Sequence, residues 1–358
     1  MPSFSKVRVI VVALLVLMGA SIAQASPHTY LVANMGTTSY GIFYPAQNAN
    51  CLNYSGQVVG GVMVGSYPHA AIWSNGTVTD LGTLPGYPRS YAVGINDAGQ
   101  VVGYCPSPTL SGVYHTFVVT GGVMTDITPA GWKYLLPDWI NNNGIVLCNG
   151  NNPSVGVGVE TQPYLYNVNT GTNVSPSSPM LNGPTMKAIN DSSMATGANA
   201  IGNMTAFAGG TYTALPNLSG YTSSLAVCMN ALGCVAGTSN AASGAYRAFY
   251  WRSIGHNETS SGTITAIPFL GTGTNSLACG INGYSEVVGQ SDTNSTGNAR
   301  AFFWDTFQLY QLDTQLASGH GYTYQLWRGY AINDKSQIVV SGVDTSTGTG
   351  VYVLLTPQ

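Results

Sequence analysis

The chain has 358 residues, a formal net charge of −3, and a composition in which only 6% of the residues are charged. That fraction is far below the roughly 25% of ordinary globular domains, and the acidic balance argues against nucleic acid as a partner, because phosphate binding needs clustered cations. Forty-five glycines, with abundant Ser, Thr and Asn, favour an all-β protein whose hairpins need turn residues.

The first 25 residues have the three parts of a secretory signal peptide. Lys6 and Arg8 form the positive region, residues 10–18 form the apolar core, and Ala23-Gln24-Ala25 is a small-x-small cleavage site. Cleavage before Ser26 would leave eight basic residues of the ten against thirteen acidic ones, a formal charge of −5. No later stretch approaches the ~20 apolar residues of a membrane helix. We therefore expect a secreted or periplasmic protein, exported by a bacterium, with no integral membrane segment.

A strand–turn–strand unit recurs along the rest of the chain and is clearest at residues 92–103, which read AVGINDAGQVVG. Asn and Asp bond their own backbone in tight turns and Gly accepts a positive φ, so the apolar runs on either side indicate a β-hairpin. Degenerate copies lie 40 to 52 residues apart, a period typical of stacked or radial repeats. The asparagine that marks each copy occurs at Asn53, Asn96, Asn141, Asn190, Asn230, Asn282 and Asn333.

A second hairpin follows each first one. In the first unit the apolar runs 69–73 and 77–81 flank Asn75-Gly76, a dipeptide typical of two-residue hairpin turns. Each unit thus supplies four short strands, here called a to d. This content and period predict an all-β, seven-bladed β-propeller with four-stranded antiparallel blades, as a single domain over residues 26–358. A six- or eight-bladed ring and an open solenoid are the alternatives.

The two ends of the chain are complementary. The seventh unit has strands a to c, at residues 330–332, 337–340 and 351–355, and no fourth strand follows them. Residues 28–33 form a strand that belongs to no unit. We expect this N-terminal strand to lie beside residues 351–355 and complete the last blade, which would remove the open edges that invite aggregation.

The layout resembles the extracellular HAF-repeat family over essentially the whole mature chain. The resemblance is carried by residues 92–103, by Asp80-Leu81-Gly82-Thr83-Leu84, and by a slot that reads His69-Ala70-Ala71, His115-Thr116-Phe117, Arg247-Ala248-Phe249 and Arg300-Ala301-Phe302. The family's His-Ala-Phe itself never occurs verbatim. Because the family is defined by its repeat, the resemblance implies a propeller-like fold and an extracellular location, and no particular chemistry.

Six cysteines follow the signal peptide: Cys51, Cys105, Cys148, Cys228, Cys234 and Cys279. An even number in an exported protein permits up to three disulfides, but the spacing forms no metal-binding motif. Cys148 stands where the clearest repeat has Gly103. We expect most of the cysteines to be buried small apolar residues, and Cys228 with Cys234, which flank one hairpin, is the one local pair to test.

Strand order fixes which connections share a face of the ring. The a–b and c–d turns lie on one face and are short apart from residues 253–262, whereas the b–c and d–a connections lie on the other face and are long. Loops on a rigid repeat scaffold usually carry function, and aromatic rings suit sugars and protein surfaces, although each ring taken singly is also compatible with packing between blades. The predicted ligand site on the long-loop face comprises Arg89, Trp132, Tyr134, Asp138, Trp139, Tyr221, His320, Tyr322, Tyr324, Trp327 and Arg328.

Few residues are available for catalysis. Glycoside hydrolysis needs two carboxylates at a suitable separation, and most acidic residues occupy repeated turn or strand-end positions, which indicates a structural role. Four remain near the long-loop face, linked by no spacing: Asp138, Glu160, Asp292 and Asp344. His69 and His115 share a repeated slot at the start of strand c and are expected to be structural. No catalytic or phosphate-binding motif occurs, and we expect no cofactor and no metal.

Three functions follow, in order of preference. Aromatic-rich, carboxylate-poor loops favour a non-enzymatic exported binding or scaffold propeller that engages a glycan or a protein through the long-loop face. The second is a carbohydrate-active hydrolase or lyase that uses the loop carboxylates. The third is a structural envelope or matrix protein in which no loop face matters.

Overall fold

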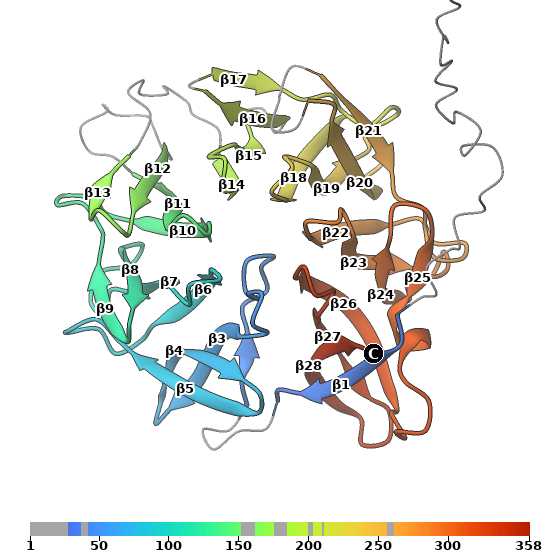
Figure 1. The fold of residues 1–358 in the computed structure, drawn as a ribbon, viewed down its shortest axis with the longest axis horizontal. Coiled ribbons are helices and arrows are strands. Elements are labelled where there is room, and N and C mark those ends of the chain that lie inside the picture. Colours follow the sequence, from blue (N-terminus) through green and yellow to red (C-terminus); the bar gives the residue numbers. More distant parts are fainter. Residues whose placement is uncertain are drawn as a thin grey trace, which may run out of the picture.

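The computed structural model describes residues 28–36, 42–151, 162–174, 185–199, 203–209, 211–255 and 261–358. The predicted signal peptide and Glu160 lie outside these residues. Figure 1 shows seven four-stranded sheets arranged around a central axis. The predicted seven-bladed ring is confirmed, and the six-bladed, eight-bladed and solenoid alternatives are wrong.

Blades 1 to 6 are antiparallel meanders in which strand a lies innermost and strand d outermost (Figure 1). Blades 1 to 3 consist of β2 (Tyr44–Pro45), β3 (Val58–Val64), β4 (Tyr67–Ser74) and β5 (Thr77–Gly82); β6 (Tyr91–Ile95), β7 (Val101–Pro106), β8 (Tyr114–Thr120) and β9 (Val123–Asp126); and β10 (Leu135–Ile140), β11 (Ile145–Gly150), β12 (Gln162–Asn167) and β13 (Thr172–Asn173). Blades 4 to 6 consist of β14 (Thr185–Ile189), β15 (Ala195–Ala198), β16 (Met204–Ala208) and β17 (Thr211–Ala214); β18 (Ser223–Met229), β19 (Val235–Asn240), β20 (Tyr246–Ser253) and β21 (Gly262–Ala266); and β22 (Ser276–Ile281), β23 (Val287–Asp292), β24 (Ala299–Trp304) and β25 (Leu309–Gln311).

Blade 7 takes its strands from both ends of the chain. After the 3-10 helix η2 (Leu312–Gln315) come β26 (Tyr324–Ile332), β27 (Ile338–Asp344) and β28 (Thr349–Pro357), and β1 (Tyr30–Asn34) adds antiparallel to β28. Val32 pairs with Leu355 and Asn34 with Val353, so the predicted closure of the ring is confirmed.

One feature of the repeat shapes the inner edge of the blades. The glycine of the Val-Val-Gly stretch allows strand a to approach strand b, since a Cβ on Gly103 would overlap the carbonyl oxygen of Tyr91. Beside this glycine, or beside Cys148 in blade 3, strand a of blades 2 to 6 carries a β-bulge, and β26 carries one at the matching distance from its asparagine. A bulge leaves one residue of strand a out of the ladder and redirects its side chain.

The aromatic residues that recur on strand c pack between neighbouring blades. Trp73, Trp251 and Trp304 are at most 4% exposed. In the part of the chain that the structure describes, no helix has the length and apolar character needed to cross a membrane.

Candidate functional site

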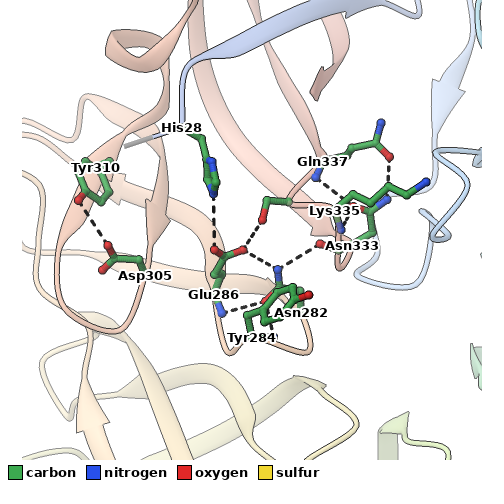
Figure 2. A network of polar contacts seen from close by, with 10 residues as sticks. His28, Asn282, Tyr284, Glu286, Asp305, Tyr310, Asn333, Lys335 and Gln337 are labelled. Carbon is green, nitrogen blue, oxygen red and sulfur yellow. Dashed lines mark hydrogen bonds and ion pairs between the residues drawn. The ribbon is translucent and has the colours of Figure 1, made fainter. Parts of the chain in front are cut away.

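A ring of asparagine side chains surrounds the central channel near the short-turn face. Nδ2 of each repeat asparagine donates to the backbone oxygen of the next one, and the ring closes from Asn333 to Asn53 at 2.9 Å. Figure 2 shows the link from Asn282 to Asn333. The six other bonds, 2.9 to 3.3 Å long, run from Asn53 to Asn96, Asn141, Asn190, Asn230, Asn282 and Asn333 in turn.

Each of these asparagines also closes its own turn. Asn96 Oδ1 accepts from the backbone N–H of Gln100 at 2.9 Å, and Asn96 Nδ2 donates to Gln100 Oε1 at 2.7 Å. In blade 6 Glu286 takes the glutamine position, accepts from the Ser336 hydroxyl at 2.6 Å and lies 3.8 Å from the His28 imidazole (Figure 2). Because both ends of the asparagine amides are bonded within the protein, this ring holds the blades together.

The turn carboxylates beside the asparagine ring are structural as well. Each accepts from a backbone N–H of the preceding blade and so ties neighbouring a–b turns together. The bonds are Tyr54 N to Asp97 Oδ1 (2.7 Å), Asn142 N to Asp191 Oδ1 (2.7 Å) and Gly283 N to Asp334 Oδ1 (2.6 Å).

Two segments lie in the channel behind this ring: the connection between β2 and β3, and the part of β10 that carries Trp139. Between β2 and β3 the chain leaves blade 1 as the blue loop near the centre of Figure 1, and Asn50 exchanges two hydrogen bonds with the backbone of Ile140 in blade 3 (2.8 and 3.2 Å). Ala49 and Trp139 pack against residues of blades 5 and 6 across the channel. A hollow of about 150 Å³ remains on the short-turn side. Trp139, predicted for the long-loop face, therefore packs inside the channel from β10.

The position three residues before each repeat asparagine holds six residue types in the seven blades, with valine in two of them. In blades 2 to 7 it is the residue that the bulge leaves unpaired. In the adjacent blades 3 and 4 it is Asp138 and Lys187, and Lys187 Nζ lies 2.7 Å from Asp138 Oδ1. We call these seven positions the variable ring: Asn50, Val93, Asp138, Lys187, Val227, Cys279 and Tyr330.

Asp138 and Lys187 line a cleft formed by blades 2, 3 and 4, toward the long-loop end of their strands. The cleft has a volume of about 410 Å³. Its other walls include tyrosines from three different elements and one asparagine: Tyr104, Tyr114, Tyr134 and Asn149. Of the predicted site residues, the structure thus brings Tyr134 and Asp138 together.

The Asp138 carboxylate is held through both oxygens. Oδ1 accepts from Lys187, and Oδ2 accepts from Asn149 Nδ2 at 2.5 Å. The Asn149 amide is itself fixed by the backbone of Met186, with bonds of 2.7 and 3.1 Å. Burial raises the pKa of Asp138, and the charge and hydrogen bond of Lys187 offset part of that rise. The 17% exposed side chain of Asp138 therefore has a fixed position in the cleft wall.

A second cleft adjoins the first at Tyr104, which lines both. It has a volume of about 400 Å³ and lies between blades 1 and 2, where Tyr44 and Tyr91 contribute to its walls. The rings of Tyr104 and Tyr91 stack with centroids 5.2 Å apart, and Tyr114 meets Tyr104 edge-on at 5.8 Å. We call the tyrosines that line these two clefts the tyrosine arc: Tyr44, Tyr91, Tyr104, Tyr114 and Tyr134.

Three predicted site residues lie elsewhere on the long-loop side. Trp132 packs edge-on against Tyr164 at 5.3 Å in the core between blades 2 and 3, and Tyr221 packs against the core of blades 4 and 5. Arg89 is exposed, with its guanidinium 5.4 Å from the ring centroid of Tyr67. None of the three lines either cleft.

The remaining predicted residues lie on β26 or in the connection that leads to it from η2. His320, Tyr322 and Tyr324 form a stacked series with centroids 5.4 and 6.0 Å apart, and the Tyr322 hydroxyl accepts from the backbone N–H of Val32 in β1. Tyr324 lies on β26, and so do Trp327 and Arg328, because β26 extends well into the segment expected to be a loop. Trp327 is 42% exposed, and Arg328 Nε donates to Cys279 Sγ at 3.2 Å.

The cysteines and histidines have the structural environments expected of them. All six cysteines are buried free thiols, so Cys228 and Cys234 are not paired. His69 Nδ1 lies 3.1 Å from Asp80, and His115 Nδ1 lies 2.6 Å from Asp126, in each case joining strand c to strand d. Among the described residues no group of His, Cys, Asp and Glu could hold a metal ion.

The carboxylates considered for hydrolysis do not converge among the described residues. Asp292 is 6% exposed and accepts from Asn275 Nδ2 at 3.1 Å in blade 6. Asp344 accepts from the hydroxyls of Ser346 and Thr323 at 2.6 and 2.7 Å in blade 7. Neither lines the cleft that holds Asp138.

Sequence reasoning missed Tyr104, Tyr114, Asn149 and Lys187, which complete the cleft. Three of them lie on strands b or c and Lys187 on strand a, whereas the sequence predicts a site built mainly from loops. A position-by-position comparison of the repeats would have singled out Asp138 and Lys187, since the same position holds apolar or uncharged residues in the other blades.

Comparison with known proteins bears on the fold alone. No protein-family model matches the chain, and no curated protein matches it. Among solved structures, an acylaminoacyl peptidase from Pyrococcus horikoshii is similar with a TM-score of 0.53 at 10% identity, over 90% of this chain and 52% of the peptidase. TolB from Acinetobacter baumannii matches with a TM-score of 0.43 at 12% identity, over 84% of this chain and 80% of TolB. The chain therefore spans about half the length of the peptidase, and at this identity the likeness extends to the fold and not to its activity.

Proposed function

We propose that the protein is an exported, non-enzymatic binding propeller that holds its ligand at the tyrosine arc. The observation that carries this proposal is the pair of adjoining clefts, of about 410 and 400 Å³, that share Tyr104. Both volumes fall in the range of ligand-binding pockets, which combine mostly apolar or aromatic walls with a few fixed polar groups. Asp138 is the one carboxylate among the described residues that line the clefts, which favours binding over two-carboxylate hydrolysis.

Replacement of arc tyrosines by leucine tests the binding role. Tyr104→Leu and Tyr134→Leu keep most of the apolar volume and remove the aromatic ring and hydroxyl. We expect both variants to lose capture of the ligand found by screening the wild type against a glycan array and a secreted-protein fraction. The matched control is Tyr284→Leu, since Tyr284 is 71% exposed on the short-turn face. Loss of capture in the control with retention in both arc variants would contradict the proposal.

Export is the second part of the proposal. The signal-peptide pattern of residues 1–25 and the resemblance to the HAF-repeat family support it. Expression of the whole chain in a bacterium, followed by N-terminal sequencing of the recovered protein, tests it directly. We expect Ser26 as the first residue of protein recovered from the periplasm or medium, and an uncleaved Met1 in protein confined to the cytoplasm would refute export.

A further inference from the structure

The polar end of the larger cleft presents a hydrogen-bond donor beside an acceptor. The Asp138 carboxylate accepts one bond from Lys187 and one from Asn149, and each carboxylate oxygen has more than one acceptor site. Lys187 has three N–H donors and uses one on Asp138, while its side chain is 47% exposed. A ligand in the cleft therefore meets both a fixed acceptor and a fixed donor within one short span.

The charges of this pair cancel, so the cleft has no net charge from Asp138 and Lys187 with which to select an ionic ligand. A hydroxyl group is the natural complement, since it donates to the carboxylate through its hydrogen and accepts from the ammonium through its oxygen. Two adjacent hydroxyls on one ring would satisfy both groups together. Charge-assisted hydrogen bonds of this kind are about twice as strong as neutral ones.

The walls of the cleft supply the apolar half of the recognition. Tyr104, Tyr114 and Tyr134 line it, and the negative π-face of a tyrosine attracts the positive C–H edges of a saturated ring. A ring with polar hydroxyls at its rim and C–H groups on its face is a sugar. Resting on the proposed binding function, we infer that the cleft binds a neutral saccharide, with vicinal hydroxyls on Asp138 and Lys187 and its C–H face on the tyrosines.

The second cleft indicates that the ligand is longer than a single sugar unit. It adds about 400 Å³ on the other side of Tyr104, where Tyr44 and Tyr91 contribute to the walls and no charged residue lines it among the described residues. A chain of at least two sugar units would pass over Tyr104, with one unit in each cleft. Oligosaccharides are therefore the expected ligands, and monosaccharides would bind more weakly because they fill one cleft.

Titration calorimetry on the whole mature protein tests this inference. The probes are disaccharides to hexasaccharides of glucose, mannose, xylose and N-acetylglucosamine, with oligogalacturonate as the anionic comparison. We expect saturable binding of at least one neutral series, with affinity that rises from the monosaccharide to the oligosaccharide. Lys187→Met and Asp138→Asn should each weaken that binding about tenfold or more, the loss expected for one charge-assisted hydrogen bond.

Matched controls separate the site from the rest of the surface. Lys335→Met removes an exposed lysine near the asparagine ring, and Tyr284→Leu removes an exposed tyrosine; both should leave affinity unchanged. Thermal melting of each variant confirms that it is folded. Preferential binding of oligogalacturonate, lost in Lys187→Met and strengthened in Asp138→Asn, would overturn the neutral-saccharide assignment. Capture of a protein at the arc with no saccharide binding would also overturn it while leaving the proposed function standing.

Discussion

The asparagine ring and the variable ring occupy the same channel and are built from the same repeat, yet they differ in one respect. The asparagine ring has one residue type in all seven blades, and each amide is bonded to its own turn and to the next blade. The variable ring lies three residues earlier in each blade, and its seven side chains include apolar, amide, thiol, phenol and charged groups. The asparagine is the same in every blade because each blade needs it for assembly. The variable-ring residue can differ between blades, and this difference allows an asymmetric site to form.

The seam of the ring, where β1 pairs with β28 in blade 7, is the place where a change should have the largest effect on stability. Deletion of residues 28–34 removes β1, leaves the outer edge of β28 unpaired and eliminates the fully buried Tyr30. We expect loss of cooperative thermal unfolding followed by circular dichroism, because the last blade can no longer close. Native-like melting of the shortened chain would show that the ring is stable without its N-terminal strand.

Single substitutions compare the two rings directly. Asn96 is 2% exposed, and Asn96→Ala removes its bonds to Asn141 and Gln100 and leaves buried backbone groups without partners. Each such buried group costs about 1–3 kcal/mol, so we expect a loss of about 2–4 kcal/mol in urea unfolding. Lys187→Met in the variable ring should cost less, because Lys187 is 47% exposed and Asn149 still donates to the Asp138 carboxylate after the ammonium is removed. Equal losses would contradict the division between an assembly ring and a free one.

The pH dependence of stability sharpens the description of Asp138. Its pKa is raised by burial, so the folded protein binds the proton more tightly than the unfolded chain does. Relative to Asp138→Asn, the wild type should therefore gain stability as the pH falls through the raised folded pKa, until the unfolded value near 3.9 is passed. Urea unfolding of both proteins from neutral to acidic pH measures the difference. A wild type that loses stability relative to the variant over this range would contradict the raised pKa.

The smallest expected effect concerns Glu286, the one acidic residue at the position four residues after the repeat asparagine. Glu286→Gln places in blade 6 the amide found in blades 1, 2 and 7, keeps an acceptor for Asn282 and Ser336, and loses the ion pair with His28 (Figure 2). That pair is 3.8 Å long and His28 is 37% exposed, so thermal unfolding should change by less than about 1 kcal/mol. A much larger loss would mean that the carboxylate charge itself stabilises the seam.

The sequence was sufficient for the fold because each blade carries its own marker. Each repeat asparagine marks one a–b turn, so the number of these asparagines predicts the number of blades. The extra N-terminal strand and the missing fourth strand of the last unit predict that β1 pairs with β28. The sequence does not reveal the boundaries of β26, because residues 324–329 lack the turn signals of the other inner strands and so predict a loop at Trp327 and Arg328.

The candidate site was harder to predict because its parts come from three blades. Asp138 and Lys187 are 49 residues apart and meet only because they occupy equivalent bulges in neighbouring blades. A bulge leaves no mark in hydrophobic periodicity, and the tyrosines that face the cleft look like ordinary strand residues. Trp139 shows the opposite case: its place beside a predicted loop indicates a ligand contact, but its side chain packs across the channel.

The seam also has a consequence for how the molecule is made. Among the described strands β1 comes first in the chain and its partner β28 comes last, so this long-range pairing can form only after the other described strands have been made. Until then the early blades lack their final neighbour, and β1 has nowhere to dock. The ring is therefore completed late, after the strands of the other six blades have been made.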